Sequence, residues 1–295
     1  MIAERRKIML VRPHAGLCNR LRTLTSSLIL ARELDMQLRL HWVPGDGCWC
    51  LFGDLFENHP EIECTSFAGS ALPPRLGKEI DWLARQLPKK LHGAALAARH
   101  DVAKPYRILT RTDIEAGDYV LDPTAMNGHS LILFRNVMPF RPKGWTTERY
   151  EEAVSEFLRS LKPTPAIQEK LFDLPHGTIG VHARRGDHQR SSAISTDHHF
   201  LRAIETRLNE RPQARLYVAS DDLSFVETIR RRYPERILDR GAINRSRHDH
   251  IGMQDALADL IMLSRCAEIL GSAISSYSEY AAAFHRIPLY KVGTA

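Results

Sequence analysis

The sequence predicts an α/β protein with mostly parallel sheets, built as two domains that face each other across a ligand cleft. Short runs rich in Val, Ile and Leu alternate with amphipathic segments along the whole chain, as in βαβ units. The chain opens with a strand, a glycine-containing loop, a helix and a second strand, the order that begins a parallel sheet. Its 295 residues are enough for two domains, and Pro163-Thr164-Pro165 places the boundary, giving 1–162 and 163–295.

In the first half, the apolar run at 8–12 is read as a strand. Leucines recur at helical spacing within 20–34, which predicts a helix, and the second strand follows at 38–43. The tract 44–74 is predicted to form loops that leave Trp49, Phe52 and Phe56 exposed. Later elements of this half are a helix at 81–101, strands at 106–109, 119–121 and 131–137, and a helix at 148–161.

The second half repeats the alternation more regularly. The predicted strands are 179–182, 214–219, 236–238, 269–270 and 288–292. The predicted helices are 199–208, 223–233, 254–266 and 277–285.

The composition indicates a globular protein with an anionic ligand. Hydrophobic residues make up 43% and charged residues 26% of the chain, and the net charge is +6. Arg outweighs Lys in the polar tracts, which favours forked contacts with a phosphate or carboxylate. A basic stripe with interleaved aromatic residues is missing, so nucleic acid is not the expected partner.

The expected location is the cytoplasm. The apolar run near the N-terminus stops at Arg12, too early for a signal-peptide core, and no stretch approaches the roughly 18 apolar residues of a membrane helix. The five cysteines are scattered and odd in number, which favours reduced thiols, and we read the Cys48/Cys50 pair as structural or incidental. We therefore expect no integral membrane segment; the oligomeric state is left unassigned.

Four polar clusters follow predicted strands. Because ligands collect at the carboxyl ends of parallel strands, convergence of these clusters predicts a functional cleft. The clusters are 16–20, 182–187, 220–222 and 271–276.

The cluster at 182–187 reads HARRGD. Strand alternation aims His182 and Arg184 one way and Arg185 the other. One arginine can then meet a diphosphate, while the other pairs with a neighbouring carboxylate, for which Asp187 is available. The alternative is a solvated strand end with a surface ion pair, and spacing does not decide between the two.

The segment GSAISSYS places small hydroxyl residues between a strand and a helix. Amides at a helix start, with serine side chains, can hold a phosphate. The alternative is an ordinary N-cap by Ser275 or Ser276. The segment lacks the Walker lysine and the GxGxxG spacing, so neither a P-loop kinase nor a dinucleotide dehydrogenase is supported.

The ASDD segment ends another predicted strand. Asp222 is a candidate N-cap for the next helix, whereas Asp221 could contact a ligand hydroxyl or orient an arginine. This acid pair lacks a third ligand, and His248-Asp249-His250 lies in an arginine-rich loop, so no metal site is predicted.

Taken together, these tracts resemble the GDP-fucose-dependent fucosyltransferases of the GT-B fold, which include rhizobial nodulation α1,6-fucosyltransferases and protein O-fucosyltransferases. An HxRRxD tract, a strand ending in (S/T)DD and a later serine-rich tract make the resemblance specific. The matching segments are GLCNRLRTLTSSLILA (16–31), VHARRGD (181–187), YVASDD (217–222) and DLIMLSRCAEILGSAISSYSEYAA (259–282).

The resemblance implies two facing Rossmann-like domains, with 1–162 on the acceptor side and 163–295 on the donor side. It implies that Arg184 contacts the donor diphosphate, that Asp259 bonds the guanine, and that Ser275 and Ser276 hold the β-phosphate, while Asn19 reaches the donor from the first domain. The donor-binding set is Gly16, Asn19, Arg20, His182, Arg184, Arg185, Asp221, Asp222, Asp259, Ser272, Ser275 and Ser276.

The activity implied is inverting transfer of fucose, or a related sugar, from a GDP donor to a hydroxyl of a glycan or glycolipid precursor, without a metal or other cofactor. The expected catalytic residues are Arg184 and Asp187, with the base unassigned among Asp187, Asp46 and Asp54. The alternative is a GDP-sugar-binding protein without transferase activity.

Overall fold

The structure is a computed structural model that describes residues 7–45, 47–64, 106–109, 114, 119–126, 131–134, 139–186, 189–238, 240–241 and 243–294. The chain divides into two compact units. Unit 1 is Met1–Lys162 with Arg247–His250, and unit 2 is Pro163–Ser246 with Ile251–Ala295. The short segment at 247–250 therefore groups with the first half of the chain, which the sequence did not suggest.

Unit 1 contains a parallel five-stranded sheet in the order β3-β2-β1-β6-β4, and β5 and β7 form a separate parallel pair. Leu21, Leu24 and Leu28 are buried on α1, which explains why their spacing folds as a helix against the sheet. The described elements are β1 (Ile8–Val11), α1 (Leu17–Glu33), β2 (Gln37–Leu40), η1 (Phe52–Asp54), β3 (Ile62–Cys64), β4 (Tyr106–Leu109), β5 (Val120–Leu121), η3 (Pro123–Met126), β6 (Leu131–Phe134), β7 (Arg141–Pro142) and α4 (Thr147–Ser160).

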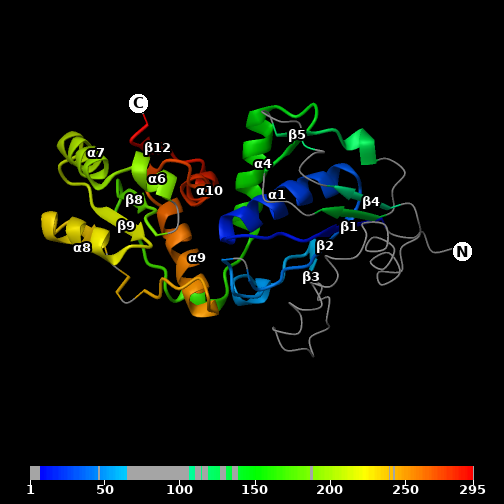
Figure 1. Cartoon of the computed structure of the whole chain (residues 1–295), viewed down its shortest axis with the longest axis horizontal. Helices are drawn as coiled ribbons and strands as arrows, with labels where there is room; N and C mark the ends of the chain where they lie inside the picture. Colours follow the sequence, from blue (N-terminus) through cyan, green and yellow to red (C-terminus); the bar gives the residue numbers. More distant parts are fainter. Residues whose placement is uncertain are drawn as a thin grey trace, which may run out of the picture. The chain divides into compact units, whose positions relative to one another are not determined.

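Unit 2 also contains a parallel five-stranded sheet, in the order β10-β9-β8-β11-β12. Helices α7 and α8 lie on one side of it and α9 and α10 on the other (Figure 1). The elements are α5 (Pro165–Gln168), β8 (Ile179–Ala183), α6 (Gln189–Ile194), α7 (Asp197–Glu210), β9 (Leu216–Ser220), α8 (Leu223–Arg232), β10 (Ile237–Leu238), α9 (His250–Ser264), β11 (Glu268–Ser272), α10 (Ser276–His285) and β12 (Leu289–Val292).

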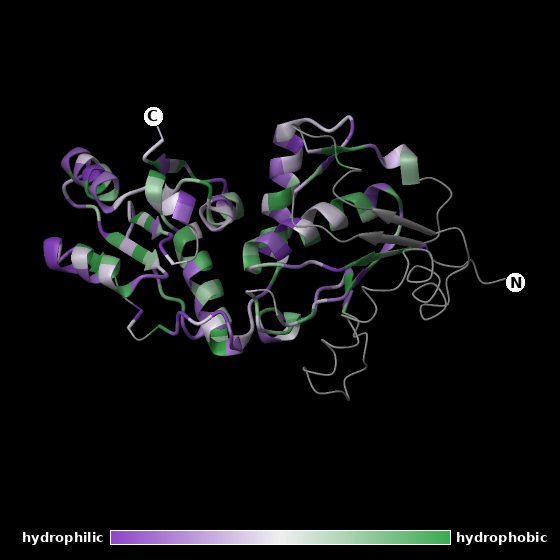
Figure 2. Cartoon of the chain, viewed as in Figure 1, coloured by the Kyte–Doolittle hydropathy of each residue, from purple (hydrophilic) through white to green (hydrophobic). Residues whose placement is uncertain are grey.

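Apolar residues occupy the interior of unit 2, as its hydropathy shows. The strands are mostly green in Figure 2, whereas the outer turns of α7 and α8 are purple. Phe200 and Phe225 bring these two helices together with β8 and β9 in one buried cluster. Helix α9 is buried on nearly all sides, so the charged residues that it carries must find partners inside the protein.

Strand β8 lies at the centre of the unit 2 sheet, between β9 and β11. The chain runs outward from β8 through β9 to β10 and then returns to place β11 on the other side of β8. This reversal is a topological switch point, the place where open α/β sheets bind ligands. The fold thus brings three of the predicted polar clusters, those at the ends of β8, β9 and β11, to the same edge.

The predicted fold class, α/β with parallel sheets, is confirmed, and differences are confined to shorter elements. Phe52 and Phe56 are buried rather than exposed, because the turn of η1 packs Phe52 against Trp42 and Phe56. The sequence did not indicate η1, β3, η3, β7, α5 or α6. The helix predicted at 81–101 lies outside the described residues. Among the described helices, none is both long and apolar enough to cross a membrane.

Gly271→Ala is expected to destabilise the protein by about 1–3 kcal/mol, because the new methyl group would overpack a tight contact. An added Cβ would lie 2.6 Å from Ser278 Cβ and 2.8 Å from Leu289 Cδ1. Chemical unfolding measures the effect. Gly53→Ala is the control, since its Cβ would meet no atom within 4 Å. Equal midpoints for the two variants would contradict the close packing of α10 on β11.

Candidate functional site

The candidate site lies at the carboxyl ends of β8 and β11 in unit 2. The Arg184 amide donates to Ser272 Oγ at 2.9 Å, so the last residue of β11 fixes the backbone of the first residue beyond β8. Ser192 Oγ donates to the carbonyl of Arg184 at 3.2 Å. Arg184 itself stays partly exposed. Its backbone is therefore held on both sides, and the residue as a whole is half-buried.

A serine network in and after α6 ties the two strand ends together. Ser191 Oγ donates to the Ala273 carbonyl at 2.5 Å, and the Ala273 amide donates to Ser195 Oγ at 2.8 Å. Ser195 Oγ in turn donates to the Val292 carbonyl at 2.6 Å. Because Ala273 directly follows β11, the network fixes the turn that leads into α10.

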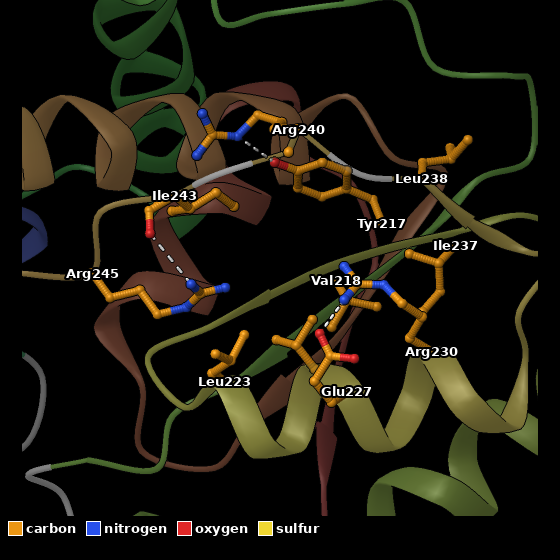
Figure 3. Close-up of a pocket in the computed structure, with 12 residues that line it drawn as sticks. Tyr217, Val218, Leu223, Glu227, Arg230, Ile237, Leu238, Arg240, Ile243 and Arg245 are labelled. Carbon is orange, nitrogen blue, oxygen red and sulfur yellow. Dashed lines mark hydrogen bonds and ion pairs between the residues drawn. The ribbon is translucent and has the colours of Figure 1, made fainter.

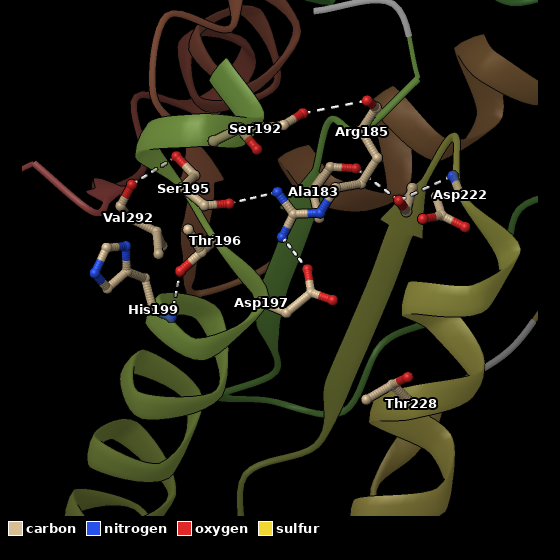
Figure 4. A network of polar contacts seen from close by, with 12 residues as sticks. Ala183, Arg185, Ser192, Ser195, Thr196, Asp197, His199, Asp222, Thr228 and Val292 are labelled. Atoms are coloured by element: carbon tan, nitrogen blue, oxygen red, sulfur yellow. Dashed lines mark hydrogen bonds and ion pairs between the residues drawn. The ribbon is translucent and has the colours of Figure 1, made fainter. Parts of the chain in front are cut away.

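Arg185 points into the protein, as Figure 4 shows. Its guanidinium pairs with Asp197 at 2.6 Å and contacts the Ser195 carbonyl. It also lies 5.2 Å from the Phe200 ring centre and 5.0 Å from that of Phe225. With its side chain only 10% exposed, Arg185 has a structural role. We expected Asp187 as the available partner; the carboxylate that pairs with Arg185 is Asp197, and Asp187 lies outside the described residues.

The two acids after β9 have separate roles. Asp221 Oδ1 accepts the Arg185 amide at 2.7 Å, so it orients the arginine backbone. Asp222 caps α8 through the Ser224 amide at 2.8 Å, as predicted. A hydrogen bond from the Ser224 hydroxyl lowers the pKa of the Asp222 carboxyl. The ASDD segment therefore supports the arginine loop.

His182 faces the opposite side of the sheet from Arg185. Its ring stacks on Tyr277, with centroids 4.6 Å apart, and its Nδ1 lies 2.7 Å from Ser278 Oγ. The Tyr277 hydroxyl donates to the Ala256 carbonyl at 2.5 Å. These contacts link the end of β8 to α10 and, through Ala256, to α9.

The start of α10 has the ordinary N-cap that the sequence left open. Ser275 is buried, and its hydroxyl accepts the Ser278 amide at 3.4 Å. Ser276, the first residue of the helix, is partly exposed. The preceding Ile274 has a φ of 56° and is exposed. Of the two serines expected to hold a phosphate, Ser276 is thus the accessible one.

Asp259 is buried on α9 and is held by two donors. Its Oδ1 accepts from the Tyr217 hydroxyl at 2.6 Å and from Arg240 Nε at 2.9 Å. Burial raises the pKa of the Asp259 carboxyl, and the Arg240 charge opposes this rise. Arg240 also bonds Asp255, whose second cation is Lys170 at 2.8 Å. Asp259 therefore belongs to a network of two acids and two bases, in which Lys170 is the member that is partly exposed.

A pocket of about 420 Å³ lies on the α8 side of β9 (Figure 3). Val218 and Leu223 contribute to its apolar lining. Each of its three arginines has a protein partner: Arg230 contacts Glu227, Arg240 bonds Tyr217, and Arg245 bonds the Ile243 carbonyl. Because these guanidiniums are already engaged, we do not assign the pocket to the donor phosphates.

In unit 1, the predicted residues lie where β1 leads into α1. Gly16 precedes the first helical residue, and Asn19 is partly exposed in the first turn. Arg20 is buried, and its guanidinium donates to the carbonyls of Ala15, Val43 and Gly45 at 2.6–2.8 Å. We expected Arg20 to bind the donor; in the structure its guanidinium holds two loops together, and the donor role stays a prediction.

The structure narrows the candidate bases only slightly. Asp46 and Asp187 lie outside the described residues. Asp54 Oδ2 accepts the Leu51 amide at 2.7 Å at the start of η1.

Within the described part of the chain, no group of three His, Cys, Asp or Glu residues could hold a metal ion. None of the five cysteines forms a disulfide, and the Sγ atoms of Cys48 and Cys50 lie 3.6 Å apart.

Several residues of the site were not predicted. They are Ser191, Ser192, Ser195, Tyr277 and Arg240. The tract 191–195 does carry a signal, since three serines in five residues are unusual for a helix that only packs apolar side chains. Nothing in the sequence pairs Arg240 with Asp259.

Comparison with known proteins identifies the fold. No protein-family model matches the sequence, and no curated protein matches it either. Among solved structures, NodZ alpha-1,6-fucosyltransferase soaked with GDP-fucose has a TM-score of 0.61 at 17% identity, covering 97% of this chain and 94% of that chain. NodZ from Bradyrhizobium has a TM-score of 0.60 at 16% identity, covering 98% and 96%.

Two further structures agree. A mutant of Arabidopsis thaliana FUT1 in complex with GDP has a TM-score of 0.61 at 14% identity, covering 97% of this chain and 70% of that chain. POFUT1 in complex with GDP has a TM-score of 0.60 at 14% identity, covering 99% of each chain. At these identities the likeness shows the fold: this chain has the GT-B fold of the fucosyltransferases that it resembles.

Proposed function

We propose that this chain is a glycosyltransferase that moves fucose, or a related sugar, from a GDP donor to a hydroxyl of a glycan or glycolipid precursor. The observation that carries the proposal is the hydrogen bond from the Arg184 backbone amide to Ser272 Oγ, which fixes this arginine at the switch point of the unit 2 sheet. The solved structures with this fold include fucosyltransferases bound to GDP or soaked with GDP-fucose.

The chemistry of the site suits departure of a nucleoside diphosphate. Breaking the bond from fucose to GDP leaves positive charge on the sugar and adds negative charge to the β-phosphate. Arg184 carries a permanent charge on a fixed backbone, and Ser276 stands at the start of α10, where backbone amides favour anions. Because the fold already holds Arg184 and the start of α10 in place, these groups can stabilise the developing charge without reorganising during the reaction.

We assign donor binding to unit 2 and acceptor recognition to unit 1. Asp259 is assigned to the guanine, because a buried carboxylate with one oxygen held by protein donors can offer the other to the base. Transfer is proposed to invert the configuration at the anomeric carbon. It is also proposed to need no metal, since Arg184 supplies the positive charge that a metal ion would provide. The base that deprotonates the acceptor is one of Asp46, Asp54 and Asp187.

The test is incubation of the purified protein with GDP-fucose and a panel of glycan and glycolipid acceptors, with products identified by mass spectrometry. We expect fucosylated product, stoichiometric GDP and the same rate with EDTA present. A GDP-sugar-binding protein without transferase activity would bind the donor yet yield no product on any acceptor. That outcome would replace the proposed activity with the binding function.

A further inference from the structure

The network around Asp259 has an asymmetry between its two acids. Both oxygens of Asp255 are used: Oδ1 accepts from Lys170 and Arg240, and Oδ2 accepts the Asn244 amide at 2.8 Å. In Asp259, Oδ1 accepts from both Tyr217 and Arg240. Of the residues that the structure describes, none donates to Asp259 Oδ2. The protein thus holds one oxygen of this carboxylate and leaves the other open as an acceptor.

Arg240 is placed to act on the charge of Asp259. Its side chain is 3% exposed, and its Nε and Nη2 lie 2.9 Å and 2.8 Å from the same oxygen. The second donor, the Tyr217 hydroxyl, is neutral, because burial raises the pKa of Tyr217 well above its ordinary value. The nearby Asp255 adds a negative charge, which Lys170 offsets. Within the described part of the chain, Arg240 is therefore the cation in direct contact with Asp259.

The charge of Asp259 decides what its open oxygen can bind. An ionised carboxylate only accepts hydrogen bonds, whereas a protonated carboxyl also donates one. Guanine presents two adjacent N–H donors, at N1 and at its 2-amino group. Adenine presents an acceptor at N1 instead. Only the ionised form of Asp259 therefore discriminates in favour of guanine.

We propose that Arg240 is a specificity-determining positioning residue: by keeping Asp259 ionised and its second oxygen open, it makes the donor site select guanine. This inference rests on the proposed function, in which Asp259 contacts the base. Burial alone pushes the pKa of Asp259 upward, and the guanidinium opposes that push. Without the guanidinium, burial acts on the Asp259 carboxyl with less opposition, so we expect its pKa to rise further and its protonated fraction to grow.

The experiment is calorimetric titration of the full chain with GDP and ADP from about pH 6 to about pH 8.5, a range in which the guanine N1 proton is retained. The wild type should hold a constant preference for GDP. Arg240→Gln should lose about tenfold or more of the preference at neutral pH and regain it as the pH rises. Arg240→Lys, which keeps the charge, should retain most of the preference at every pH.

Arg245→Gln is the matched control. Arg245 lies in the same loop and lines the same pocket, but it bonds the carbonyls of Ser220 and Ile243 rather than a carboxylate. This variant should keep the wild-type preference for GDP. Thermal unfolding of every variant confirms that the binding site is folded at the temperature of the titration.

Two results would overturn the inference. One is an Arg240→Gln variant that binds GDP and ADP more weakly by the same factor with no recovery at higher pH. The other, which applies even when this variant does not fold, is a wild-type preference that falls steeply toward low pH, because Arg240 would then fail to hold Asp259 ionised. A wild type without any preference for GDP would instead remove the guanine role of Asp259, and the inference would fall with it.

Discussion

Arg184→Ala is expected to lower kcat/KM for transfer from GDP-fucose by about two to three orders of magnitude or more, because it removes the charged donor that we propose for the leaving phosphate. The fold should survive, since the variant keeps the backbone amide that bonds Ser272 and the carbonyl that accepts from Ser192. Steady-state kinetics and thermal unfolding measure the two quantities separately. Arg184→Lys should recover part of the activity, because an ammonium supplies charge without the guanidinium fork.

The control for this prediction is Arg202→Ala, which removes an exposed arginine from α7. Its kinetics should match those of the wild type. Wild-type kcat/KM in Arg184→Ala would contradict the assignment of Arg184 to the diphosphate. A large loss of thermal stability in Arg184→Ala would show that the Arg184 side chain has a structural role instead.

Arg185→Ala is expected to affect stability rather than activity. It should destabilise unit 2 by about 2–4 kcal/mol. The change removes the guanidinium that lies near the Phe200 and Phe225 rings and contacts the Ser195 carbonyl. The melting temperature should fall by several degrees. Activity of the fraction that remains folded should fall far less than in Arg184→Ala.

Asp197→Ala separates the two contributions of Arg185. Asp197 is 57% exposed, so its ion pair with Arg185 should contribute only about 0–1 kcal/mol. Most of the stability that Arg185→Ala removes should therefore remain in Asp197→Ala. If Asp197→Ala destabilises the protein as much as Arg185→Ala does, then the ion pair holds Arg185 in place, rather than packing between the aromatic rings.

The sequence predicted the regular elements of the fold well, because their periodicity reports which face is buried. The buried leucines of α1 and the alternation of strands and helices from β8 to β12 are examples. Its prediction of exposed aromatic residues in the loops of 44–74 was wrong for Phe52 and Phe56, which are buried. There, burial of Phe52 and Phe56 depends on contacts with Trp42 that no local pattern encodes.

For the site, the sequence located the polar residues at the strand ends. It did not show which of these side chains turn into the protein and which of them hold the backbone. It could not show whether Arg184 or Arg185 turns inward, because the answer depends on Phe200 and Phe225 from two later helices. It also could not reveal that Ser191 bonds the Ala273 carbonyl, 82 residues away. Contacts of this range follow from the strand order, in which β11 returns to lie beside β8.

The central claim is that the unit 2 site binds a guanine nucleotide through Arg184 and Asp259. Calorimetric titration of the wild type with GDP, UDP and ADP tests it most directly, with Arg184→Ala and Asp259→Asn beside it. We expect GDP to bind most tightly, Arg184→Ala to weaken all three nucleotides, and Asp259→Asn to remove only the preference for guanine. Equal affinity of the wild type for GDP, UDP and ADP would contradict the claim.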